Sequence, residues 1–249
     1  MNIQDFMKEK TYTKFCHYTS VSNARCILSN DSALFLNKLE KMNDLDELGI
    51  HESDKDKVFL LSFCHSEAMD IPLFYLYGGI DGKGCRIEFT HKKICQLIQG
   101  DLVPVNKRNK MLKKKYLKLD YDVYVGWVHY VASNGIEFYR NTIIDGGFNS
   151  FEKAIDNLEA RNESYFVKKF FWKYEKEFRI VVKFKYDVPY DRVALKFPVD
   201  NNEKGISLMC GPELETSDMQ EIKDEFYEYG IRKIQKFDNI NIKMDLNNK

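Results

Sequence analysis

The sequence predicts an α+β protein with a single domain over residues 1–240. Short apolar strand segments and amphipathic helix segments follow one another without regular βα repeats, which argues against a doubly wound sheet or a barrel. No internal repeat or low-complexity linker divides the chain, although residues 101–170 fit an insertion and residues 241–249 form a polar tail. A length of 249 residues, 44% of them hydrophobic, is sufficient for one substantial core.

The charge balance excludes a general electrostatic attraction to nucleic acid or membrane, because Lys+Arg and Asp+Glu number 38 each. The first residues lack a secretion signal, and no segment is long and apolar enough to span a bilayer. The six cysteines show no CxxC spacing, so we expect a cytoplasmic protein with reduced thiols. The Cys16-His17 and Cys64-His65 pairs resemble zinc ligands, but no further ligand pair accompanies them, which favours structural roles.

The first half of the chain predicts strands in which apolar residues are continuous or alternate, at residues 14–18, 33–36, 58–64 and 85–89. Ser20 and Thr90 are suited to cap the helices that follow the first and last of these strands. A turn or short helix begins at Asp70. It carries the aromatic residues Phe74, Tyr75 and Tyr77. The glycine-rich residues 78–84 form a flexible turn, and because a strand rather than a helix follows them, a hairpin or loop is favoured over a phosphate-binding loop.

The second half begins with a basic run that includes Lys107–Lys115, interpreted as a solvated loop or helix face or, alternatively, as a phosphate-contacting patch. A capping-box pattern at Asn149 predicts an amphipathic helix that continues to about residue 171, and a second such pattern at Ser217 predicts another helix. Strands are expected at residues 121–131, 193–197, 206–210 and 231–237.

The most informative segment is Tyr174–Arg179, which leads directly into the apolar residues 180–182. Side chains alternate between the two faces of a strand, so Glu175, Glu177 and Arg179 are predicted to project to the same side. Charged groups are costly to bury unless they are paired. The pattern therefore predicts either a local arrangement of ion pairs or a functional site.

Six short motifs follow one another in a fixed order: His17-Tyr18-Thr19-Ser20, Met42-Asn43-Asp44 with Glu47, Leu61-Ser62-Phe63, Leu73–Gly78, Tyr174–Arg179 and Gly211-Pro212. This ordered set resembles a widespread bacterial family known only as a domain of unknown function, often found near mobile elements and phage-defence genes. The similarity covers residues 14 to 237, and one departure is Phe74, where the family usually has Trp.

That family is in turn distantly similar to the ADP-ribosyltransferases, which bind NAD in a cleft between two small mixed or antiparallel sheets with flanking helices. The resemblance implies NAD as substrate, no metal, and an unidentified protein or nucleic-acid acceptor. It implies catalytic roles for His17, Tyr77 and Glu177. It implies substrate-binding roles for Thr19, Ser20, Asn43, Ser62, Tyr75, Glu175 and Arg179. An NAD glycohydrolase, with water as the acceptor, fits the same residues.

Other interpretations stay open. His17 fits a structural histidine, the two tyrosines fit core aromatics, and Asn43 fits a turn that caps the next segment. A non-catalytic module that senses a nucleotide or a phage protein would use the same cleft. A metal-dependent hydrolase related to nucleases is the third candidate. Its Mg²⁺ would be held by Asp44, Asp46, Glu47 and Glu177.

Overall fold

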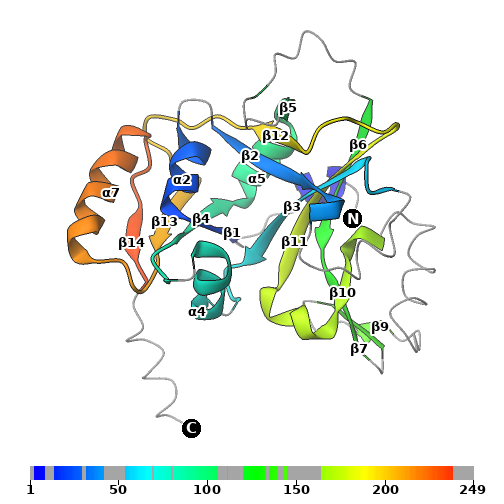
Figure 1. Ribbon diagram of the computed structural model, residues 1–249, viewed down its shortest axis with the longest axis horizontal. Helices are drawn as coiled ribbons and strands as arrows, with labels where there is room; N and C mark the ends of the chain where they lie inside the picture. Colours follow the sequence, from blue (N-terminus) through cyan, green and yellow to red (C-terminus); the bar gives the residue numbers. More distant parts are fainter. Residues whose placement is uncertain are drawn as a thin grey trace. The chain divides into compact units, whose positions relative to one another are not determined.

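The computed structural model of the chain (Figure 1) describes residues 3–8, 14–29, 32–41, 54–68, 70–79, 81–105, 111, 120–132, 135–138, 143–144 and 164–237. The class is α+β, as the sequence predicts. The chain divides into two compact units, each composed of three chain segments. Unit 1 comprises residues 1–11, 34–68 and 97–196, and unit 2 comprises residues 12–33, 69–96 and 197–249.

Unit 1 contains strands that are neighbours in the order β5–β12–β2–β3–β11–β6. Their bounds are β2 (Ala33–Lys38), β3 (Val58–His65), β5 (Leu102–Val105), β6 (Tyr121–Trp127), β11 (Glu177–Phe184) and β12 (Arg192–Lys196). The strands β3, β11 and β6 run side by side and antiparallel (Figure 1). Almost every residue of β3 and β11 is buried, which explains their nearly continuous apolar sequences. The short strand β5 was not predicted.

A second, four-stranded sheet of unit 1 has the order β10–β7–β8–β9. Its strands are β7 (His129–Ala132), β8 (Gly135–Phe138), β9 (Ile143–Ile144) and β10 (Val167–Lys169). The prediction of one strand over residues 121–131 is therefore wrong, because β6 and β7 belong to different sheets. The chain leaves β6 at Val128, whose N–H donates to the carbonyl of Glu177 at 2.8 Å.

The predicted helix of residues 149–171 is wrong in its last part. Residues 149–163 lie outside the described residues, and the remainder forms a 3-10 turn (Ser164–Phe166), the strand β10 and the start of a 3-10 helix (Phe170–Glu175). Tyr165 and Phe166 pack into a core cluster with residues of β3 and β11, and this packing outweighs the local helical pattern. The described part of this unit also contains α1 (Ile3–Lys8) and a 3-10 turn (Leu39–Lys41).

Unit 2 contains a sheet in the order β14–β13–β4–β1, in which β14 pairs in parallel with β13 and the other pairs are antiparallel. Its strands are β1 (Lys14–Thr19), β4 (Cys85–Thr90), β13 (Ile206–Cys210) and β14 (Ile234–Lys236). Its described helices are α2 (Val21–Leu28), α4 (Asp70–Leu73), a π-helix (Phe74–Gly78), α5 (His91–Ile98, of which residues 91–96 belong to this unit) and α7 (Thr216–Glu228).

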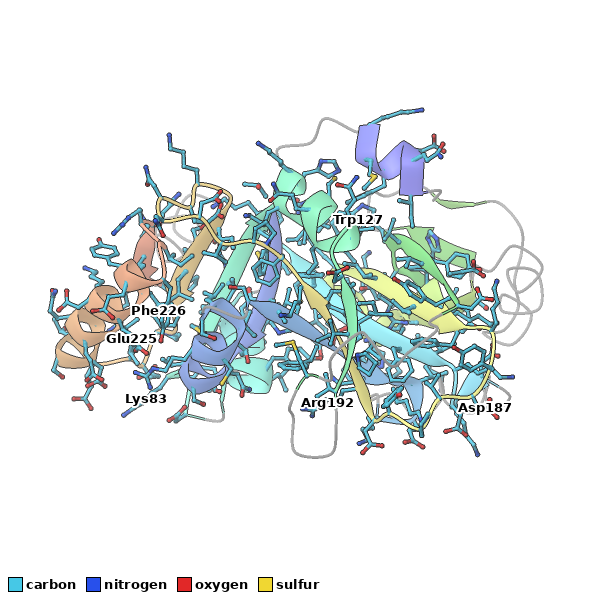
Figure 2. The ribbon with its side chains drawn as sticks, turned by 90° about the horizontal axis from the view of Figure 1, so that it is seen from above. Lys83, Trp127, Asp187, Arg192, Glu225 and Phe226 are labelled. Carbon is cyan, nitrogen blue, oxygen red and sulfur yellow. The ribbon has the colours of Figure 1, made fainter. Side chains whose placement is uncertain are left out.

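The helix α7 buries an apolar face formed by Met219, Ile222 and Phe226, and Figure 1 shows the helix next to β14. Two consecutive residues of α7, labelled in Figure 2, illustrate the two faces: Phe226 is fully buried, and Glu225 accepts a hydrogen bond of 2.7 Å from Arg25 Nε of α2. The predicted cap at Ser217 is wrong by two residues, because the helix begins after Glu215 and no side chain caps it. The predicted cap of α2 is confirmed, since Ser20 Oγ accepts from the Asn23 N–H at 3.2 Å.

Candidate functional site

The charged segment before β11 changes backbone conformation in its middle. Lys176 adopts a left-handed conformation with a φ of 45°, which separates the 3-10 helix ending at Glu175 from the strand starting at Glu177. The prediction that Glu175 shares one strand face with Glu177 and Arg179 is therefore wrong. Only Glu177 and Arg179 share a face of β11.

The Glu177 carboxylate accepts hydrogen bonds from the strand that bears it and from a neighbouring strand. Arg179 Nε donates to Oε1 at 2.7 Å, and Arg179 Nη2 donates to Oε2 at 3.2 Å. Ser62 Oγ of β3 also donates to Oε1. This contact follows from the register of the sheet, in which Ser62 lies opposite Arg179.

Lys168 of β10 joins both glutamates of the segment. Its Nζ lies 2.8 Å from a carboxylate oxygen of Glu175 and 2.8 Å from one of Glu177. We refer to Ser62, Lys168, Glu175, Glu177 and Arg179 as the Glu177 cluster. The cluster contains two acidic and two basic side chains, and each of these four is at most 7% exposed.

Two further residues fix the position of the Glu177 cluster. The Tyr130 hydroxyl accepts a hydrogen bond of 2.9 Å from the Glu177 N–H, and the Tyr165 carbonyl accepts one of 2.6 Å from Arg179 Nη1. Burial, and then the negative charge of Glu177, raise the pKa of Tyr130, so its hydroxyl stays neutral. Sequence reasoning missed both tyrosines and Lys168, because nothing in the local pattern shows that these three residues contact Glu177 and Arg179.

The electrostatics of the cluster keep Glu177 ionised. Burial alone would raise the pKa of this carboxyl, but the adjacent charges of Arg179 and Lys168 outweigh burial and hold the pKa well below its ordinary value. Groups with strongly perturbed pKa values and specific charge partners are candidates for functional sites, although structural ion-pair networks perturb pKa values too. Chemically, the cluster provides a desolvated carboxylate in a fixed position beside a hydroxyl group.

Five further predicted site residues belong to unit 2, namely His17, Thr19, Ser20, Tyr75 and Tyr77. His17 and Thr19 are on β1, where His17 is half-buried and Thr19 is buried. Ser20 is occupied as the cap of α2, so its hydroxyl has a structural role. Tyr75 and Tyr77 lie on the π-helix that follows α4, and the Tyr75 hydroxyl donates to Glu213 at 3.0 Å.

Phe74 of the motif at residues 73–78 is a packing residue. It is fully buried and meets Tyr18 edge-on, with 5.1 Å between the ring centroids. Its second aromatic neighbour is Phe237, at 5.4 Å. Phe74 therefore belongs to the hydrophobic core.

Several sequence-based assignments fall outside the described residues. They include Asn43, the acidic residues Asp44, Asp46 and Glu47, and the Lys107–Lys115 run apart from Met111. Among the described residues, no three His, Cys, Asp or Glu side chains are grouped in a way that could hold a metal ion. No helix in the described part of the chain is long and apolar enough to cross a membrane.

Unit 2 also contains buried carboxylates, among them that of Glu88 on β4. It accepts hydrogen bonds from Lys14 Nζ and Arg86 Nη2, and one of 2.7 Å from Ser207 Oγ. Burial works to raise the pKa of Glu88, but the charge of Arg86 and the hydrogen bonds of all three partners lower it to about 2. The ionised carboxylate therefore joins the strands β1, β4 and β13.

Acid should remove the stabilisation that Glu88 supplies. Because its folded pKa is depressed from 4.5 to about 2, this contribution is complete above about pH 4.5 and is lost as the pH falls toward 2. We expect Glu88→Gln to be less stable than the wild type at pH 7 and to lose less stability between pH 5 and pH 3. Urea unfolding at several pH values measures both effects. Glu228→Gln, at an exposed position of α7, should follow the wild-type pH profile, and identical slopes for all three proteins would contradict the assignment.

Comparison of the chain with models of protein families, with curated proteins and with solved structures gave no match.

Proposed function

We propose that this chain is an NAD-using ADP-ribosyltransferase or NAD glycohydrolase in which Glu177 is the catalytic carboxylate. The observation that carries the proposal is the state of Glu177, which is held ionised by Arg179 and Lys168 and is hydrogen-bonded to Ser62. Breaking the bond between nicotinamide and ribose generates positive charge on the ribose, and a fixed carboxylate stabilises such charge. The motif resemblance supplies the substrate class.

The proposed reaction replaces one bond at the ribose C1′ atom by another. The C1′–N bond breaks, and nicotinamide leaves with the bonding electron pair as a neutral molecule. The oxygen or nitrogen of an acceptor, or a water molecule, then bonds to C1′ and loses a proton. Glu175 is the proposed acceptor of that proton, directly or through Lys168, to which its carboxylate is bound.

Burial sets a requirement on this mechanism. Glu177 is only 2% exposed, and its oxygen atoms already bind Ser62, Arg179 and Lys168. Substrate binding must therefore displace at least one partner. Lys168 is the proposed one, because it belongs to a strand of only three residues, Val167–Lys169.

Nicotinamide release from NAD, measured with purified protein in the presence and absence of cell lysate as acceptor source, tests the proposal. Glu177→Gln should reduce release by about 100-fold or more, since a single electrostatic contact in a transition state has effects of about 10²–10³. Glu175→Gln removes the other carboxylate bound to Lys168, which is the proposed proton acceptor, and it should reduce both transfer and hydrolysis. Circular dichroism and thermal unfolding monitor the fold of each variant. If Glu177→Gln does not fold, Ser62→Ala replaces it, with a smaller expected loss.

The absence of nicotinamide release from folded wild-type protein under both conditions would contradict the proposal. A second candidate, a nucleotide-sensing module without catalysis, is favoured by the same saturation of the carboxylate by the protein's own side chains. It predicts that NAD or another nucleotide raises the unfolding temperature and is recovered intact.

A further inference from the structure

Unit 2 contains a pocket that none of the predicted site residues lines. Its volume is 390 Å³, within the size range of small-ligand sites. Its walls come from the start of β1, the end of β4, the start of β13, residues 202–205 and residues 232–233. The pocket lies at the Lys14 end of β1. The predicted substrate-binding residue Thr19 is at the other end of this strand, five positions or about 17 Å away.

The inner wall of the pocket is rigid because its acidic residues are already paired. Glu88 is bound by Lys14, Arg86 and Ser207, as described above. Glu203 is 5% exposed, and its carboxylate accepts from Lys93 Nζ at 2.6 Å. These contacts neutralise the two carboxylates that line the pocket.

Glu203 also fixes the loop that forms the rim. Its Oε1 atom accepts a hydrogen bond of 2.6 Å from the Gly205 N–H, and its own N–H donates to the Gly230 carbonyl at 3.0 Å. Lys93 Nζ donates in addition to the Pro198 carbonyl at 2.8 Å. The rim is therefore held from both ends, which fixes the backbone that carries Lys204.

The rim carries positive charge that the described acidic residues do not pair. Four basic side chains line the pocket, against the two acidic ones already paired. Lys204, Arg232 and Lys233 are all exposed, and among the described residues neither lysine forms an ion pair. Arg232 is positioned by a hydrogen bond of 2.9 Å to the Asn201 carbonyl and lies over the Tyr227 ring at 5.6 Å.

We propose that this pocket binds a small phosphorylated ligand through Lys204, Arg232 and Lys233. Ammonium and guanidinium groups form strong, charge-assisted hydrogen bonds with phosphate oxygen atoms. The residues lining the pocket include no aromatic side chain, so recognition rests on the phosphate groups and not on base stacking. This proposal is independent of the proposed NAD chemistry, because it concerns residues of unit 2 that take no part in that reaction.

Isothermal titration calorimetry with pyrophosphate, inorganic phosphate and sulfate at constant ionic strength tests the proposal. The wild type should bind pyrophosphate saturably at one site, more tightly than phosphate, while sulfate should bind more weakly than pyrophosphate. The double variant Lys204→Ala/Lys233→Ala should weaken pyrophosphate binding by about tenfold or more, from the loss of two charge-assisted contacts.

The matched control is Lys92→Ala/Lys236→Ala, which removes the same net charge from exposed positions of unit 2 that do not line the pocket. It should change the affinity less than twofold. Three results would overturn the proposal: no saturable binding of pyrophosphate by the wild type, equal weakening in both double variants, or binding that sulfate reproduces fully. Because the variants leave the Glu177 cluster intact, nicotinamide release measured in parallel separates this result from the proposed function.

Discussion

Replacing Glu177 with alanine is expected to lower the free energy of unfolding by about 3–5 kcal/mol, the range for removing one partner of a buried ion pair. The substitution leaves Arg179 and Lys168 with a single carboxylate between them, although each is at most 7% exposed. An unpaired buried cation has lost its hydration without compensation, which is the main source of the cost. Urea unfolding of the wild type and the variant at pH 7 measures the difference.

A matched control separates this effect from the loss of any salt bridge. Asp187 is labelled in Figure 2. Its Oδ1 atom lies 3.7 Å from Lys57 Nζ, and its side chain is 73% exposed. Solvent and salt screen such a pair, so Asp187→Ala should cost about 0–1 kcal/mol. The double variant Glu177→Ala/Arg179→Ala should cost less than the sum of its single variants, because each single change leaves an uncompensated charge. Additive effects, or a cost for Glu177→Ala no larger than that of the control, would contradict the argument.

The sequence could identify β11 as an unusual strand, because charged residues stand directly before an apolar run. It also indicated Ser62, which the sheet register brings to Glu177. It could not indicate Lys168, since that contact depends on the parallel pairing of β10 with β7, and two short strands of this kind have little local signal. Pairings between distant segments are set by packing rather than by local propensity.

The same limit explains the misassigned conformation of Glu175. The alternation rule applies only where the backbone is extended, and the left-handed conformation of Lys176 interrupts it. A lysine in that conformation has no sequence signature comparable to glycine. Lys168 nevertheless binds both carboxylates, so Glu175 and Glu177 belong to one cluster although they do not share a strand face.

The second large effect is expected at Gly84, where alanine should cost at least about 3 kcal/mol, the upper end of the overpacking range. A Cβ atom at this position would lie 2.0 Å from the Gly78 carbonyl oxygen, so the backbone of one or both segments must move. The same contact is tied to a third segment, because the Gly211 N–H donates to the Gly84 carbonyl at 2.7 Å. The glycine-rich turn predicted from the sequence is therefore a place of close backbone packing, and space requires glycine at position 84.

Gly78 offers a control at the same contact. A Cβ atom at Gly78 would meet Gly84 Cα at 3.3 Å, which requires an adjustment of only a few tenths of an ångström. We therefore expect Gly78→Ala to change stability by about 1 kcal/mol or less, while Gly84→Ala lowers the unfolding midpoint in urea strongly. Because both substitutions add one methyl group to the same pair of segments and reduce the backbone entropy of the unfolded chain similarly, the difference between them isolates the steric contact. Equal costs for the two variants would contradict the argument that the close approach of Gly84 to the Gly78 carbonyl sets the cost.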